Sequence, residues 1–266
     1  DTMTVGENLA FPLRNRGMPK EKITKRVGEI AEMLEMSGQL NQRAAGLAAD
    51  AKQKISLGRG LVREDVSAVL FDEPLTVIDP HLKWQLRRKL KQIHHELRLT
   101  LIYVTHDQVE ALTFADHVLV MTRGRAVQMG SAAELFERPS HTFVGHFIGS
   151  PGMNFIVAQV KKDKVHVSGM VLDLPKDIKI TDGEIKLGIR PEYMTFTDAN
   201  AEGSLPMSVT QIQDVGTHVI LSASTAGQSI KARMPVELAT YAKGDTVWLK
   251  VLGENTCIYK DEEIVA

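Results

Sequence analysis

The stretch Ala68-Val69-Leu70-Phe71-Asp72-Glu73 is an apolar run that ends in two adjacent carboxylates. A run of this length predicts a parallel strand, at about residues 66–71, that is buried on both faces. Carboxylates at the carboxyl end of such a strand emerge at the edge of the sheet, where open α/β folds bind their ligands. The stretch therefore predicts an α/β fold with a polar site directly after the strand.

A second apolar run, residues 99–105, repeats the arrangement and ends next to His106. Between the two runs the sequence has the period of a helix, with Asp79 as its N-cap and Pro80 as its first residue. Strand, helix and strand in this order predict parallel neighbours whose carboxyl ends meet at one edge. Two carboxylates and an imidazole at that edge suit Mg²⁺ binding and activation of a water against a phosphate. The predicted apolar face of the helix is Leu82, Leu86, Leu90, Ile93 and Leu97.

Two further helices are predicted upstream of the first strand. Pro19 opens one that should run to about Ser37, with Gly38 as its stop. Another should start at Ala51, with Asp50 as its N-cap. Together with the residues before Pro19, these segments predict a small helical lobe.

Local signals also define the segment that follows the second strand. Residues 117–122 and 125–129 predict a hairpin around Arg123-Gly124. Ser131 and Glu134 have the spacing of a capping box, which predicts the start of another helix.

The pattern changes at about Pro151. Residues 155–266 show short alternating runs separated by Asp, Gly and Pro, which predict an all-β domain. We expect Trp248 to lie in its core. The predicted division is a first domain of residues 1–150, with a helical lobe at about 5–65 and the strand region at 66–130, and a β domain of residues 151–266.

Composition excludes several classes of protein. The 266 residues carry a net charge of −1, so no strong basic field indicates nucleic-acid binding. Cys257 is the single cysteine, which excludes an internal disulfide. No apolar stretch approaches the roughly 20 residues that span a bilayer, and no signal peptide is visible. We therefore expect contact with a membrane only through partner subunits.

The motifs in this order resemble the ATPase subunits of ABC transporters. In that family's terms they are the Walker B strand with its glutamate, the D-loop and the switch histidine. Two later motifs resemble the maltose and glycerol-phosphate importer type, whose ATPases carry an added OB-like, TOBE-type β-barrel domain. The quoted motifs are Leu70-Phe71-Asp72-Glu73-Pro74-Leu75, Ile78-Asp79-Pro80, Val104-Thr105-His106-Asp107-Gln108-Val109-Glu110-Ala111, Gly149-Ser150-Pro151-Gly152-Met153-Asn154-Phe155 and Gly188-Ile189-Arg190-Pro191-Glu192.

The resemblance implies a role for each site residue, with ATP and Mg²⁺ as the cofactors. Asp72 would hold Mg²⁺ through water, and Glu73 would act as the base or orienter for the attacking water. His106 would contact the γ-phosphate and stabilise charge in the transition state. Asp79 would bridge across a dimer to the partner site.

One family motif has no counterpart in the sequence. No segment has the P-loop form G-x-x-x-x-G-K-[ST], which wraps backbone amides and a lysine around phosphates. Residues 1–11 resemble the stretch just after the family's glutamine loop, so we expect a partial P-loop NTPase domain that is incomplete at its N-terminal side. The alternative is a native protein without a P-loop. We expect this incomplete chain, residues 1–266 alone, to be inactive.

A second family motif is altered. The nucleotide-contacting signature Leu-Ser-Gly-Gly-Gln is matched here by Leu47-Ala48-Ala49-Asp50-Ala51. The serine hydroxyl is absent, the glycines that let backbone approach a phosphate are replaced, and Asp50 would repel a γ-phosphate. We expect this segment to be impaired, which favours a pair with a second, non-identical ATPase over a homodimer.

These observations predict an ATP-hydrolysing subunit of an ABC importer at the cytoplasmic face of the membrane. The expected solute is a small polyol, a sugar or a glycerol-phosphate-like compound. The expected partners are transmembrane permease subunits, which would dock on residues 5–45, a second ATPase and, indirectly, a solute-binding protein. No nucleic acid is expected. The alternative is a non-hydrolytic scaffold or regulatory subunit of the same kind of complex.

Overall fold

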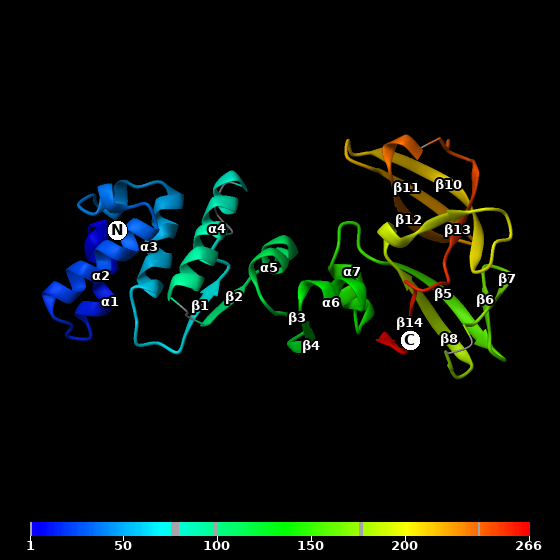
Figure 1. Ribbon diagram of the computed structural model, residues 1–266, viewed down its shortest axis with the longest axis horizontal. Coiled ribbons are helices and arrows are strands. Elements are labelled where there is room, and N and C mark those ends of the chain that lie inside the picture. Colours follow the sequence, from blue (N-terminus) through cyan, green and yellow to red (C-terminus); the bar gives the residue numbers. More distant parts are fainter. Residues whose placement is uncertain (1, 76–79, 98–99, 176–177, 239) are drawn as a thin grey trace. The chain divides into compact units, whose positions relative to one another are not determined.

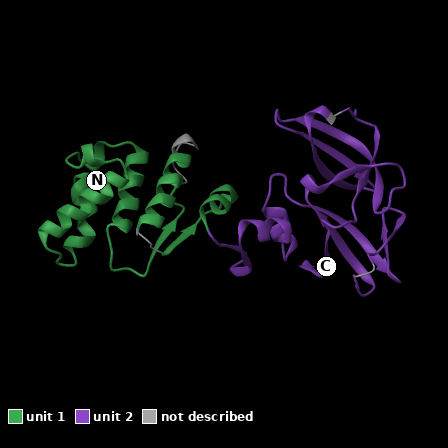
Figure 2. Ribbon diagram, in the orientation of Figure 1, with its two compact units in different colours: residues 1–115 green, residues 116–266 purple. Residues whose placement is uncertain are grey.

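The computed structural model describes residues 2–75, 80–97, 100–175, 178–238 and 240–266 (Figure 1). The chain forms two compact units, residues 1–115 and 116–266 (Figure 2). The first unit combines helices with a pair of strands, and the second is mainly β. Residues 116–150 belong to the second compact unit, whereas the predicted division of the chain into domains places them in the first.

The N-terminal part of the first unit is the predicted helical lobe. Leu9 of the first helix, Ile30 of the second and Leu61 of the third are all inaccessible to solvent and share one apolar core. Thr4 and Glu7 form a capping box at the start of the first helix. The helices are α1 (Val5–Arg14), α2 (Lys20–Met33) and α3 (Ala49–Leu61), with short 3-10 turns η1 (Ser37–Gln39) and η2 (Ala44–Gly46) between the last two.

Two predicted helix boundaries are wrong. The second helix ends at Met33, because Glu35 adopts a left-handed conformation with φ of 59°, and Gly38 is not its stop. The third helix starts at Ala49, after an extended Ala48 whose side chain cannot cap it. Asp50 is therefore the second residue of the helix and not its N-cap.

The two predicted strands form a parallel pair, β1 (Ala68–Asp72) and β2 (Thr100–Val104), joined by α4 (Pro80–Leu97) and followed by α5 (Gln108–Phe114). Val69 and Phe71 face the same core as Leu90 and Ile93 of α4. The expectation of a strand buried on both faces is wrong, since Leu70 is 71% exposed. One face of the strand pair packs on the helices, whereas the opposite face is open to solvent in the described part of the chain.

The second unit starts with the predicted hairpin, β3 (Val118–Thr122) and β4 (Arg125–Gly130). Both turn residues, Arg123 and Gly124, have positive φ, as a two-residue hairpin turn requires. The predicted capping box of Ser131 and Glu134 is confirmed at the start of the next helix. Two short helices follow, α6 (Ala132–Glu137) and α7 (Thr142–Phe147).

Two antiparallel sheets make up the rest of this unit, as the alternating pattern predicts. Their inner faces share one large apolar core. Trp248 is only half-buried and lies outside this core, because Val247 and Leu249 on either side of it point inward. The first sheet has the order β15-β14-β8-β5-β6-β7, with β5 (Asn154–Lys161), β6 (Lys164–Val167), β7 (Met170–Asp173), β8 (Gly183–Ile189), β14 (Cys257–Lys260) and β15 (Glu263–Ile264). The second has the order β12-β11-β10-β13-β9, with β9 (Thr195–Thr197), β10 (Ser204–Asp214), β11 (Val219–Thr225), β12 (Gln228–Met234) and β13 (Thr246–Lys250).

Side chains join the two sheets where no strand ladder does. The Asn154 amide donates to Lys231 O and accepts from Lys231 N, both at 2.8 Å. The Gln228 amide makes the same double contact with the backbone of Val157. Each amide thus replaces a peptide group and links β5 to β12. No helix in the described ranges is long and apolar enough to span a membrane.

Candidate functional site

The site begins where β1 and β2 end side by side. Asp72 lies opposite Val104 in the register of the parallel pair, and the Glu73 amide donates to Val104 O at 2.9 Å. Glu73 then has a φ of 45°, in the left-handed region, so the chain turns sharply away from the strand. The two carboxylates therefore emerge at the carboxyl edge of the sheet, as the sequence predicts.

His106 meets Glu73 at this edge. Its Nδ1 lies 2.9 Å from Glu73 Oε1, with 69% of the His106 side chain and 44% of the Glu73 side chain exposed. The hydrogen bond to Glu73, and then the charge of Glu73, raise the pKa of His106 above its ordinary value. An exposed carboxylate and imidazole held together can exchange a proton with a bound water and place positive charge near a phosphate.

Asp72 is the candidate ligand for a nucleotide-bound Mg²⁺. Its side chain is exposed next to Glu73 at the strand end. No group of three or more His, Cys, Asp or Glu side chains in the described residues could hold a metal by itself. Mg²⁺ is usually held by one or two carboxylates together with waters and substrate phosphates. This donor set therefore fits Mg²⁺ that arrives with a nucleotide, and it does not fit a metal site made by the protein alone.

The altered signature segment forms the start of α3. Ala48 and Ala49 are exposed and Asp50 is half-buried, beside a groove of about 550 Å³ that Lys54 and Arg88 also line. The first intrahelical bond of α3 runs from Lys52 N to Ala48 O, so the preceding amides have no acceptor within the helix.

Gln53 on the same helix connects α3 to the strand end. Its amide donates to Pro74 O, directly after Glu73. The structure thus brings Asp72, Glu73 and His106 together and links the signature helix to them, whereas the predicted D-loop residue Asp79 lies outside the described residues.

A buried carboxylate behind the site has no predicted role. Glu110 on α5 is 3% exposed, although it lies four positions after His106 in the quoted motif. It accepts hydrogen bonds from Thr105 Oγ1 at 2.9 Å and Tyr103 Oη at 3.0 Å. Burial, followed by the charge of Glu110, raises the pKa of Tyr103. In the sequence, the only sign that Glu110 is buried is its position between two apolar residues, Val109 and Ala111.

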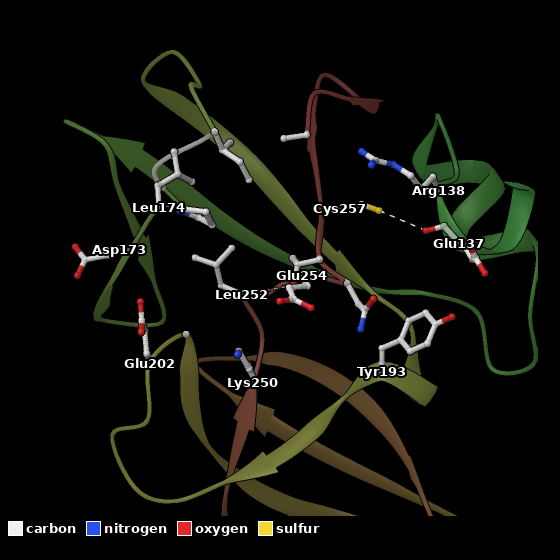
Figure 3. A pocket seen from close by; sticks show the side chains of 17 residues that line it. Glu137, Arg138, Asp173, Leu174, Tyr193, Glu202, Lys250, Leu252, Glu254 and Cys257 are labelled. Carbon is white, nitrogen blue, oxygen red and sulfur yellow. Dashed lines mark hydrogen bonds between the residues drawn. The ribbon is translucent and has the colours of Figure 1, made fainter.

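The second unit contains a cavity that the sequence does not predict. It has a volume of about 1040 Å³, and Cys257 lies at its wall (Figure 3). The thiol contacts Glu137 O at 3.7 Å, and burial raises the pKa of Cys257, so the thiol stays protonated. Four carboxylates and two cationic side chains line the cavity. They are Glu137, Asp173, Glu202, Glu254, Arg138 and Lys250.

Known proteins resemble both units of the chain in sequence. Residues 149–194 match the MalK OB fold domain and residues 187–257 match the TOBE domain. The chain is 39% identical over 257 residues to the sn-glycerol-3-phosphate import ATP-binding proteins UgpC of Shigella sonnei and Escherichia coli K12, which covers 95% of the chain and 71% of each relative. It is 33% identical over 270 residues to the protein of the same name from Vibrio vulnificus, covering 98% of the chain and 70% of the relative.

A parallel strand pair that ends in carboxylates and a histidine, together with OB and TOBE domains, defines a transport-associated ATPase subunit. Since the identity extends over most of both sequences, the chain belongs to the ATP-binding proteins of ABC importers, of the carbohydrate-importer type. These proteins are transport ATPases that act with membrane permease subunits. The resemblance identified from the motifs and the expected fold class are both confirmed.

Proposed function

We propose that the protein hydrolyses ATP to energise the import of glycerol phosphate or a related polyol or sugar. The single observation that carries the catalytic part is the contact of Glu73 Oε1 with His106 Nδ1 at 2.9 Å, at the carboxyl edge of β1 and β2. The names of the relatives support the solute class, since they are sn-glycerol-3-phosphate import ATP-binding proteins.

The proposal gives a separate task to each residue. Glu73 accepts the proton of the attacking water or orients that water. His106, held by Glu73 through Nδ1, presents Nε2 to an oxygen of the γ-phosphate, and its raised pKa favours the charged form that stabilises the transition state. Asp72 would hold Mg²⁺ through water, and the ion would neutralise charge on the phosphates. Asp79 would bridge to the second site of the ATPase pair.

The protein would act at the cytoplasmic face of the membrane, where residues 5–45 would dock on a permease subunit. Within this segment Phe11 is 40% exposed, and the Arg59 guanidinium lies 5.7 Å from the centre of its ring. A solute-binding protein would contribute indirectly, by delivering the solute to the permease.

The altered signature supports an asymmetric ATPase pair. In the head-to-tail dimers of this family, each site would combine the strand-end residues of one chain with the signature of the other. This chain would bring Asp72, Glu73 and His106 to one site, and Ala48 and Asp50 to the other. A second ATPase with an intact signature would therefore restore one fully competent site.

The test is Glu73→Gln in the complete transporter, reconstituted with its permease subunits. The amide keeps size and hydrogen bonding but cannot accept a proton, so we expect ATP turnover to fall by roughly 10²–10⁴-fold while nucleotide binding is retained. His106→Ala should also lower turnover. Glu96→Gln, an exposed position on α4 that bonds Gln92, is the matched control and should be neutral. Unchanged turnover in Glu73→Gln would remove Glu73 from this role.

Ala48 and Asp50 also favour a second candidate, a non-hydrolytic scaffold that supports an active ATPase partner. In that case Glu73→Gln in this chain would leave transport unchanged, while the equivalent change in the partner ATPase would abolish it. Measuring transport with each chain altered in turn separates the two functions.

A further inference from the structure

Glu110 lies at the meeting point of three elements of the first unit. It belongs to α5, its Oε2 accepts the hydroxyls of Tyr103 on β2 and Thr105 just after β2, and its Oε1 lies 3.6 Å from Lys83 Nζ on α4. Only 4% of the Glu110 side chain is exposed, compared with 24% for Lys83. A buried carboxylate is costly unless it is partnered, and here both oxygens have partners.

Thr105 transmits this arrangement to the next residues of the loop. Its Oγ1 donates to Glu110 and also accepts the amide of Asp107 at 3.0 Å. The two contacts fix the backbone on both sides of His106. Asp107 in turn caps α5, since its carboxylate accepts the amide of Val109 at 2.8 Å. The position of the His106 ring at Glu73 therefore depends on a loop that Glu110 holds through Thr105.

Lys83 connects α4 to Glu110 and hence to the loop that carries His106. It lies in the first turn of α4, three residues after Pro80, where the chain emerges from the segment that contains Asp79. The Lys83–Glu110 contact is thus a direct physical link between the start of α4 and the histidine loop. In this contact a lysine of α4 pairs with a carboxylate that is itself buried.

We propose that Glu110 is a positioning residue, which couples the start of α4 to the placement of His106 through Lys83 on one carboxylate oxygen and Thr105 on the other. A movement of α4 relative to β2 changes the Lys83–Glu110 contact and hence the loop that carries His106. The inference rests on the role proposed above for His106 and goes beyond it, because it assigns function to residues that touch no nucleotide.

The experiment measures kcat and KM for ATP in the complete transporter reconstituted with its permease subunits. Glu110→Gln keeps an oxygen for the two hydroxyls but faces Lys83 without a charge, and Thr105→Val removes the hydroxyl at constant shape. Because displacement of a reacting group by about 1 Å costs up to ~10²-fold, we expect each variant to lower kcat by about 10- to 100-fold. KM should stay within about twofold, since nucleotide binding is not involved.

Two matched controls lie on the same helices. Lys91→Met removes a lysine of α4 that reaches Thr113 O on α5 at 3.4 Å, and Thr113→Val removes a hydroxyl of α5 that bonds within its own helix. Both should leave kcat unchanged. Lys83→Met should lower kcat. The double variant with Glu110→Gln should have a kcat no lower than that of the slower single variant, because it leaves no buried charge without its partner.

Combination with His106→Ala separates positioning from a general loss of structure. If Glu110 acts through His106, then adding Glu110→Gln or Thr105→Val to His106→Ala should change the remaining turnover by less than about twofold. A further loss as large as the one in the wild-type background would overturn the proposal, since Glu110 would then act on stability or on another group.

The same set of variants distinguishes this inference from the proposed function. If His106→Ala turns over ATP at the wild-type rate, both the role of His106 and the positioning by Glu110 are overturned. If His106→Ala is slow while Glu110→Gln and Thr105→Val have normal kcat, only the positioning is overturned. Should Glu110→Gln fail to assemble, the Thr105→Val result decides, because that variant preserves packing volume and the Glu110 charge.

Discussion

At the residue scale, the hydrogen bond between His106 and Glu73 has a defined pH dependence. It favours the imidazolium, so the pKa of His106 lies above its ordinary value of 6.5. The stabilisation from this contact is therefore fully present below pH 6.5 and is lost as the pH rises through the raised pKa.

We predict that Glu73→Gln moves the His106 titration down toward 6.5, because the replacement removes both the charge-assisted hydrogen bond and the negative charge. Nitrogen chemical shifts of the His106 ring, followed against pH in both proteins, would measure the change. An unchanged His106 midpoint would show that the two side chains do not interact in solution.

Arg190 is a second residue whose environment predicts a large effect. It is fully buried, and its guanidinium donates to Phe136 O at 2.8 Å, to Gly145 O at 2.9 Å, to Ile148 O and to Leu135 O. These carbonyls lie at or just beyond the C-terminal ends of α6 and α7, where helices leave acceptors unsatisfied. Burial lowers the pKa of Arg190, but arginine stays charged at neutral pH.

We predict that Arg190→Met destabilises the second unit by about 3 kcal/mol or more, since each buried carbonyl left unsatisfied costs roughly 1–3 kcal/mol. Cys257 is the reporter, because the residue is only 6% exposed and its thiol reacts quickly only when the unit opens. Thiol labelling across a urea series would give the change in stability. Arg233→Met removes an exposed arginine that pairs with Glu192 at 3.6 Å and should have little effect. Equal labelling of Arg190→Met and wild type would contradict the structural role.

At the scale of elements, α3 begins without a side-chain cap. Ala48 occupies the N-cap position in an extended conformation with ψ of 163°, and its side chain makes no capping hydrogen bond. At the other end, Arg26 on α2 donates to the carbonyls of Leu61 and Val62, so two carbonyls at the C-terminal end of α3 have a side-chain partner. The carboxylate of Asp50 provides a favourable charge in the first turn of α3 without capping it.

We predict that Ala48→Ser stabilises the first unit by about 0.5–2 kcal/mol, because a serine hydroxyl at the N-cap accepts a first-turn amide. Urea unfolding followed by circular dichroism would measure the gain. Ala45→Ser, at an exposed position within η2, is the matched control and should be neutral. A loss of stability in Ala48→Ser would show that the start of α3 differs from the structure.

At the scale of the whole molecule, the altered signature predicts the composition of the transporter. A homodimer would place Asp50 in both nucleotide sites, whereas a heterodimer would have only one weak site. Purifying the complete transporter and counting its ATPase polypeptides by mass spectrometry tests the proposed pair. Two copies of this one chain would contradict it if they turn over ATP at full rate, and no faster after Ser, Gly, Gly and Gln are restored at 48–51.

Much of the fold could be predicted because its signals are local. The Arg123-Gly124 turn is determined by two residues with positive φ, and the alternating runs after residue 155 require no distant contact. Parallel pairing of β1 and β2 follows from chain order, and it brings Glu73 and His106 to one edge. The exposure of Leu70 could not be predicted in this way, since burial depends on which elements cover each face of a strand.

By itself, the sequence determined the two kinds of architecture, the family and the residues at the strand ends. These follow from periodicity and from motifs that are contiguous in the chain. Only the tertiary structure decided where α2 and α3 begin and end, and that Lys83, Tyr103 and Thr105 converge on Glu110. These helix ends depend on the backbone conformations of Glu35 and Ala48, which the periodicity does not reveal. A buried carboxylate is stable only where the fold supplies its partners, and those partners are distant in the sequence.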